Sequence, residues 1–67
     1  MISVVVPIFN EEELILKFHA AVANALNGTG EDWETVYVND GSKDSSLNLL
    51  RELQILDPNV VVVDLSR

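Results

Sequence analysis

The sequence predicts an α/β fold in which three parallel strands alternate with two helices, in the order β-α-β-α-β. Three observations support this prediction. Short runs rich in β-branched residues occur three times in the 67 residues. Two longer segments between them place apolar residues at three- and four-residue steps, which is typical of helices. Turn-forming Asn, Asp, Gly or Pro residues stand near the changes of pattern. Because helical crossovers connect parallel strands, the expected sheet is parallel and three-stranded.

The first strand is predicted over Ile2–Ile8, a largely β-branched segment that is apolar on both faces. Strands of this kind are typical of parallel sheets with both faces covered, so we expect it to be a central strand. Pro7 has no backbone N–H and is therefore expected at the end of the strand, where the hydrogen-bond ladder finishes.

A helix is predicted from Glu11 to about Asn27. Its expected buried stripe follows the apolar three- and four-residue spacing: Leu14, Phe18, Ala21, Val22 and Ala25. Asn10 is the expected N-cap residue. The three glutamates that follow Asn10 occupy the first turn, where the helix dipole favours negative charge. The segment Asn27–Gly30 is rich in glycine and ends the helix.

The second half of the chain repeats the alternation. Strands are predicted over Glu34–Asn39 and Val60–Leu65, with a turn at Asp40-Gly41-Ser42 after the first of them. The intervening helix is predicted from about Asp44 to Leu56, with Ser42 or Asp44 as its cap. Its expected apolar stripe is Leu47, Leu50 and Leu53, flanked by Leu49 and Leu56. Proline disfavours helix just before itself, so Asp57-Pro58-Asn59 ends this helix.

With the right-handed crossovers that such units almost always have, the predicted order is that of a Rossmann-like half. Three parallel strands leave at least one long strand edge unprotected. We therefore expect residues 1–67 to be the N-terminal part of a larger domain, with self-association through exposed strand edges as a possibility.

Composition excludes several classes of function. The chain has no cysteine, which excludes disulfides, thiolate metal sites and a cysteine nucleophile. Eleven acidic residues against four basic ones, a net charge of −7, exclude binding along a nucleic-acid backbone. No apolar run approaches the roughly 20 residues that span a bilayer, and the N-terminus lacks the basic region of a targeting segment, so a soluble chain is expected.

Two polar loops are predicted at one edge of the sheet, over residues 7–12 and 38–44. Ligands of open parallel sheets bind beyond the carboxyl ends of the strands, where both loops emerge. Neither the glycine-rich dinucleotide fingerprint nor a phosphate-binding P-loop is present. The loops are acidic and would repel a bare phosphate, but carboxylates accept hydrogen bonds from base N–H groups and ribose hydroxyls. The residues thus favour a nucleotide recognised through its base, with a divalent cation or basic groups from elsewhere neutralising the diphosphate.

These two segments resemble the opening of a family 2 glycosyltransferase of the GT-A fold. The resemblance is carried by Val4–Glu12 and by Val38–Ser45, which follows about 30 residues later, and it covers essentially the whole chain. The sequence is similar in particular to the polyprenyl-phosphate sugar transferases, of the dolichyl-phosphate mannose synthase and undecaprenyl-phosphate glucosyltransferase types. The ending Leu65-Ser66-Arg67 also resembles the stretch before an Asn-Phe-Gly segment in the bacterial group.

The resemblance implies a nucleotide-binding set on this span: Pro7, Phe9, Glu11, Val38 and Asp40. Phe9 stands where the family often has tyrosine, and Asn39 replaces the first acid of the family's common Asp-Asp pair. No catalytic residue and no metal ligand is expected here, since the family's Asp-x-Asp motif and catalytic acids lie further along.

The implied function is transfer of a hexose from a UDP- or GDP-sugar to a polyprenyl phosphate or saccharide acceptor. The resemblance further implies a divalent cation, Mg²⁺ or Mn²⁺, and action at the cytoplasmic face of the membrane in the cell envelope. This span would supply nucleotide recognition only and is not expected to turn over alone.

Two other functions remain open at this point. The chain also fits a receiver-like phosphoacceptor domain, with Asp64 as the phosphorylated residue, or an α/β fragment that binds nothing. Single features have ordinary explanations as well. Phe9 fits a core ring, Asp40-Gly41-Ser42 an ordinary turn, and Glu12 and Glu13 a helix-start charge cluster.

The other aromatic residues and the histidine are interpreted structurally. Trp33 and Tyr37 are expected to pack around the second strand. His19 has no second ligand candidate four residues later, where Ala23 stands, so a structural or surface role is expected.

Overall fold

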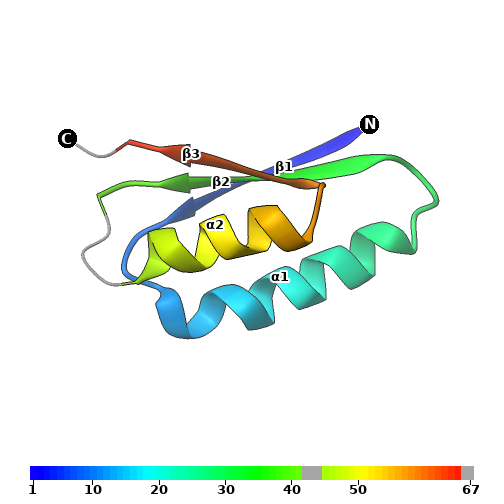
Figure 1. Ribbon diagram of the computed structural model, residues 1–67. Coiled ribbons are helices and arrows are strands. Elements are labelled where there is room, and N and C mark those ends of the chain that lie inside the picture. The colour runs from blue at the N-terminus through cyan, green and yellow to red at the C-terminus, as the bar shows by residue number, and fades with distance from the viewer. Residues whose placement is uncertain (42–44, 66–67) are drawn as a thin grey trace.

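The predicted β-α-β-α-β fold is confirmed in the computed structural model, which describes residues 1–41 and 45–65 (Figure 1). The three strands form one parallel sheet. The elements are β1 (Ile2–Ile8), α1 (Glu12–Asn27), β2 (Trp33–Asn39), α2 (Ser46–Leu56) and β3 (Val60–Asp64).

The start of each helix differs from the prediction. Glu11, not Asn10, is the N-cap residue of α1, and it makes no side-chain capping hydrogen bond. Asn10 instead has a φ of 50°, in the left-handed region, whereas an N-cap residue typically takes an extended conformation. The N-cap residue of α2 is Ser45. The predicted caps Ser42 and Asp44 lie outside the described residues.

The described sheet has the order β1-β2-β3, so β2 is the central strand of the three and β1, expected to be central, lies at an edge of this sheet. Right-handed crossovers that proceed in one direction add each strand on the same side of the last, which leaves β1 at an edge. Pro7 is the second-to-last residue of β1, close to the end of the ladder as expected.

Both helices lie on the same face of the sheet (Figure 1). The core forms between the helices and that face, from Ile8, Ile15, Tyr37, Leu50, Leu53 and Val60. Because side chains alternate along a strand, the other face carries a second apolar set. It consists of Val5, Pro7, Val36, Val38, Val61 and Val63. No described helix covers this second face, and Val5 is 65% exposed there.

The prediction of the buried stripe of α1 is wrong, because a neighbouring face of the helix packs toward the sheet. The structure buries Ile15 and His19, whereas Leu14 is 59% and Phe18 42% exposed. The helix carries apolar residues on two adjacent faces, so spacing alone does not tell which face meets the sheet. Only Val22 of the predicted stripe is even half-buried.

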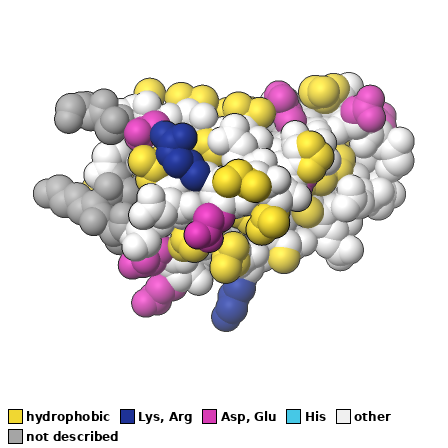
Figure 2. Space-filling view, viewed as in Figure 1, with side chains coloured by type: hydrophobic (Ala, Val, Ile, Leu, Met, Phe, Trp, Pro, Cys, Tyr) yellow, Lys and Arg dark blue, Asp and Glu magenta, His cyan; other side chains and the backbone are white. Residues whose placement is uncertain are grey.

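The stripe of α2 is confirmed except at its end. Leu50 and Leu53 are buried and Leu47 and Leu49 half-buried, but Leu56 is 80% exposed because the chain leaves the helix there. Figure 2 shows hydrophobic side chains spread over the face that carries the helices. The large exposed ones on the two helices are Leu14, Leu16, Phe18, Ile55 and Leu56.

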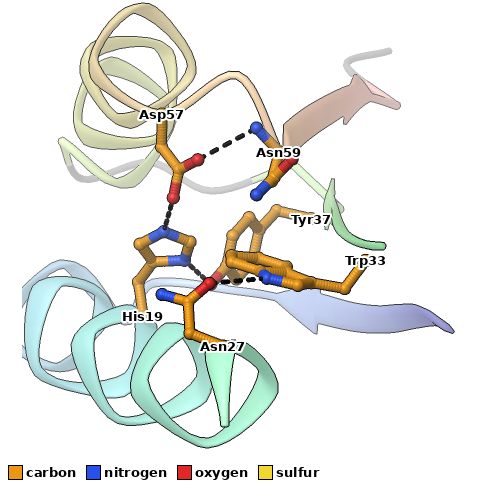
Figure 3. Close-up of polar contacts among 6 residues, drawn as sticks. All are labelled: His19, Asn27, Trp33, Tyr37, Asp57 and Asn59. Atoms are coloured by element: carbon orange, nitrogen blue, oxygen red, sulfur yellow. Dashed lines mark hydrogen bonds and ion pairs between the residues drawn. The ribbon is translucent and has the colours of Figure 1, made fainter. Parts of the chain in front are cut away.

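A buried histidine links three elements beneath the helices (Figure 3). Nδ1 of His19, on α1, lies 2.7 Å from the hydroxyl of Tyr37 on β2. Its Nε2 lies 2.9 Å from Oδ2 of Asp57, which follows α2. An ionised carboxylate can only accept, so Nε2 donates to Asp57 and, in the neutral ring, Nδ1 accepts from the Tyr37 hydroxyl. The structural role predicted for His19 is confirmed.

The predicted packing roles of Trp33 and Tyr37 are also confirmed. Both are buried, and Tyr37 is fully inaccessible. Burial raises the pKa of the Tyr37 hydroxyl, so this group remains protonated. The indole Nε1 of Trp33 donates to Oδ1 of Asn27, the last residue of α1, at 2.9 Å (Figure 3). The aromatic residues of β2 thus anchor α1 to the sheet through polar as well as apolar contacts.

Replacing the bridging histidine should destabilise the fold. The His19→Ala substitution leaves the Tyr37 hydroxyl and the Asp57 carboxylate without their partner and opens a cavity, at a cost of about 2–4 kcal/mol. Urea unfolding followed by tryptophan fluorescence measures this loss. The exposed Lys17→Ala change on the same helix is the control, with an expected effect within about 0.5 kcal/mol. Equal effects of the two substitutions would contradict the structural role.

Asp57 makes stability depend on acidity. Burial by itself would raise the pKa of this carboxyl, but the Asn59 backbone N–H and the His19 ring outweigh it and hold the pKa below its ordinary value. The folded state therefore favours the ionised form, and the stabilisation is present above about pH 4. It is lost as the pH falls through the lower folded-state pKa. Unfolding curves from pH 6 to pH 2 should show a shallower acid loss for Asp57→Asn than for the wild type; identical slopes would refute this.

Candidate functional site

The carboxyl ends of the three strands are aligned. Ile8, Asn39 and Asp64, the last residues of β1, β2 and β3, are register partners across the sheet. The pairing continues past β2, because the backbone N–H of Asp40 donates to the carbonyl of Ile8 at 3.1 Å. The N–H of Leu65 donates to the carbonyl of Asn39 at 2.9 Å. The loops after β1 and β2 therefore begin side by side at this edge.

A hydrogen bond also joins the first loop to the start of α2. The backbone N–H of Glu11 donates to Oγ of Ser46 at 3.1 Å, although 35 residues separate them. Ser46 is fully buried at the first position of α2. Sequence analysis missed this residue, and the available signal was a serine directly preceding the leucine-rich stripe.

Four of the five predicted site residues are well exposed at or near this edge. Phe9 directly follows β1 and is 57% exposed, so the alternative of a core ring is wrong. Asp40 and Glu11 are also exposed. Pro7 and Val38 are register partners on the face without helices, with Val38 half-buried. The structure thus brings an aromatic ring, two carboxylates and two apolar side chains to the same end of the sheet.

A surface hollow of about 360 Å³ lies beside the first loop. Its lining is the consecutive stretch Asn10, Glu11, Glu12, Glu13 and Leu14. Of the five predicted site residues, only Glu11 takes part in this lining. Three carboxylates at one hollow repel phosphate and favour cations or hydroxyl groups.

Asn39 is a buried polar residue at this edge. It is 2% exposed, and its Nδ2 donates to Oδ1 of Asp64 at 3.2 Å. The Oδ1 atom of Asn39 is buried without a hydrogen-bond partner in the part of the chain described. The side chain of Asn39 is therefore directed toward β3, whereas the side chain of Asp40 is exposed.

Over residues 1–41 and 45–65, no group of three or more His, Asp or Glu side chains is arranged to hold a metal ion. In the same ranges, no helix has the length and apolar character needed to cross a membrane.

Comparison with known proteins identifies the family. The sequence model of glycosyl transferase family 2 matches residues 3–67. The chain belongs to glycosyl transferase family 2. This membership confirms the resemblance that the two loop motifs carry, and it favours a glycosyltransferase over the receiver-like alternative.

Relatives of this family 2 chain are found in bacteria and phages. The chain is 43% identical over 65 residues to the uncharacterized glycosyltransferase YkcC of Bacillus subtilis, covering 97% of this chain and 20% of that protein. It is 41% identical over 66 residues to a prophage bactoprenol glucosyl transferase homolog of Escherichia coli, covering 98% and 22%. An undecaprenyl-phosphate 4-deoxy-4-formamido-L-arabinose transferase of Salmonella paratyphi B is 33% identical over 67 residues, with 98% and 20% covered. The chain thus spans about a fifth of the length of these curated relatives.

The contact between the loops should contribute to stability. Ser46→Ala removes the acceptor of the Glu11 backbone N–H, and we expect a loss of about 1 kcal/mol. The adjacent Ser45→Ala change is a matched control, because the Ser45 side chain makes no capping hydrogen bond. Its expected effect is within about 0.5 kcal/mol. Thermal unfolding of both variants tests the difference, and a Ser46→Ala variant as stable as Ser45→Ala would show that the contact is not needed.

Proposed function

We propose that this chain is the nucleotide-recognition part of a GT-A glycosyltransferase domain that transfers a hexose from a UDP- or GDP-sugar. Membership of family 2 supports glycosyl transfer. The observation that carries the proposal is the alignment of Ile8 with Asn39, which starts both motif loops at the same edge. In open parallel sheets, this is the edge at which ligands bind.

Each proposed binding residue has chemistry suited to a nucleoside. The exposed ring of Phe9 is available to stack on a base. The exposed carboxylates of Glu11 and Asp40 accept hydrogen bonds from base N–H groups and ribose hydroxyls. Pro7 and Val38 supply an adjacent apolar surface.

The phosphates of the donor need positive charge that the described part of the site does not supply. Of the described basic side chains, Lys17 lies within α1 and Arg51 within α2, and neither belongs to one of the two loops. A divalent cation, Mg²⁺ or Mn²⁺, would stabilise the departing diphosphate when bound. The described residues do not fit such an ion, since they form no metal-binding group. We therefore assign its ligands, and the catalytic residues, to sequence outside this span.

The acceptor is proposed from the relatives. The names of two of them include bactoprenol and undecaprenyl phosphate. Polyprenyl phosphate is accordingly our first choice of acceptor, with a saccharide as the second. A polyprenyl acceptor places the reaction at the inner face of the membrane, although none of the described helices has the properties of a span.

Nucleotide binding tests this function directly. Isothermal titration of the protein expressed from its complete gene, with UDP and GDP and with and without Mn²⁺, should detect binding of at least one nucleotide. Asp40→Ala should weaken that binding by about 5- to 150-fold. This is the equivalent of about 1–3 kcal/mol for the loss of a hydrogen bond that the bound nucleotide would bury.

Asp32→Ala is the matched control. Asp32 is an exposed aspartate just before β2, at the opposite end of the strand from Asp40, and its replacement should leave affinity unchanged. Absence of binding in every condition would refute the proposed function. Unchanged affinity of Asp40→Ala would refute the role of Asp40.

A further inference from the structure

The ends of β2 and β3 are joined by one amide and one carboxylate. Asn39 and Asp64 are register partners and the last residues of their strands. Nδ2 of Asn39 donates to Oδ1 of Asp64 at 3.2 Å. A hydrogen bond to an ionised acceptor is stronger than a neutral one, and this one is partly shielded because Asn39 is 2% exposed and Asp64 is half-buried. The pair therefore ties the central strand to its neighbour at the point where the second loop begins.

The carboxylate also fixes which way the amide faces. An ionised Asp64 has only acceptor atoms, so the NH₂ group of Asn39 must point toward it. The amide oxygen then remains buried without a partner among the described residues. An unpaired buried acceptor is costly, so without Asp64 the side chain would gain by turning its oxygen elsewhere. The observed orientation of Asn39 thus depends on Asp64.

This orientation bears on Asp40 through a shared peptide unit. The Asn39 carbonyl accepts from the Leu65 N–H, and the Asp40 N–H donates to the Ile8 carbonyl. The peptide that links Asn39 to Asp40 is thus held from both neighbouring strands. Loss of the Asn39–Asp64 hydrogen bond would weaken the β2–β3 pairing that holds this peptide from one side, and with it the placement of the Asp40 side chain.

We propose that Asp64 is a positioning residue for nucleotide binding, which holds Asn39 and through it the exposed carboxylate of Asp40. The inference rests on the proposed function and extends it to a residue of β3 outside both loop motifs. Asp64 itself is not assigned a contact with the nucleotide.

The same geometry requires that the two positions differ in charge. An aspartate at position 39 would set two carboxylates against each other in a largely buried place, where like charges cannot both ionise without a penalty. One amide and one carboxylate, in either order, restore a donor and an acceptor. Exchange of the two residues is therefore the critical test.

The experiment compares three variants of the protein expressed from its complete gene: Asp64→Ala, Asn39→Asp, and the exchanged double variant Asn39→Asp/Asp64→Asn. The measurements are affinity for whichever of UDP and GDP the wild type binds, by isothermal titration, and the thermal midpoint of each variant. All titrations are made well below the lowest midpoint. We expect each single variant to lose about tenfold or more in affinity, and the exchange to return it to within about threefold of wild type.

Ser3→Ala is the matched control. Ser3 Oγ donates to Glu34 Oε2 at 2.8 Å, a bond that also joins register partners on neighbouring strands but lies at the amino end of the sheet. Nucleotide affinity should not change in this variant. An equal loss there would attribute the effects to general destabilisation and overturn the proposal.

The remaining outcomes distinguish a failure of the proposed function from a failure of the role proposed for Asp64. A wild type that binds neither nucleotide refutes the proposed function and this inference together. A wild type that binds, with single variants of unchanged affinity, refutes only the inference. An exchange that restores the thermal midpoint without restoring affinity shows that the pair is merely structural, which also overturns it.

Discussion

Parallel register at the carboxyl edge is the constraint on which the candidate site depends. Ile8, Asn39 and Asp64 are paired across three strands, so segments that are about 30 residues apart in sequence leave the sheet together. Both crossovers proceed in the same direction across the sheet, with β2 in the centre, and both helices lie on one face. The loops need little local order of their own to converge, because the ladder has already aligned their first residues.

Two separate polar networks join the elements of the fold. Beneath the helices, His19 joins α1 to Tyr37 of β2 and to Asp57 after α2, a contact that secures the layers (Figure 3). At the carboxyl edge, the hydrogen bond between Asn39 and Asp64 joins β2 to β3 at the residue that precedes the exposed Asp40. The first network contributes to the packing of the helices, and the second is the one that we propose to position a ligand-binding residue. Because the chain belongs to glycosyl transferase family 2, we interpret that edge as part of a glycosyltransferase.

The chain exposes many large apolar side chains. One sheet face carries a valine-rich set with Val5 65% exposed, and Leu14 and Phe18 are exposed on α1. These residues explain a limit of prediction from spacing. Apolar periodicity identified the helix but not its buried face, because Leu14 and Phe18 form a stripe as regular as that of Ile15 and His19. The stripe of Ile15 and His19 is the one that packs toward the sheet, and the histidine has two hydrogen-bond partners there.

The sequence by itself determined the kind and order of the elements, the bounds of β1 and the ending of α2 before Pro58. These depend on local properties: β-branched runs, helical spacing and proline geometry. It also indicated, through two spaced motifs, the family to which the chain belongs. Only the tertiary structure decided which strand is central, which helix face is buried, and that Ser46 and Asp64 adjoin the loops. Those facts depend on contacts between residues 18 to 38 positions apart, which no local pattern encodes.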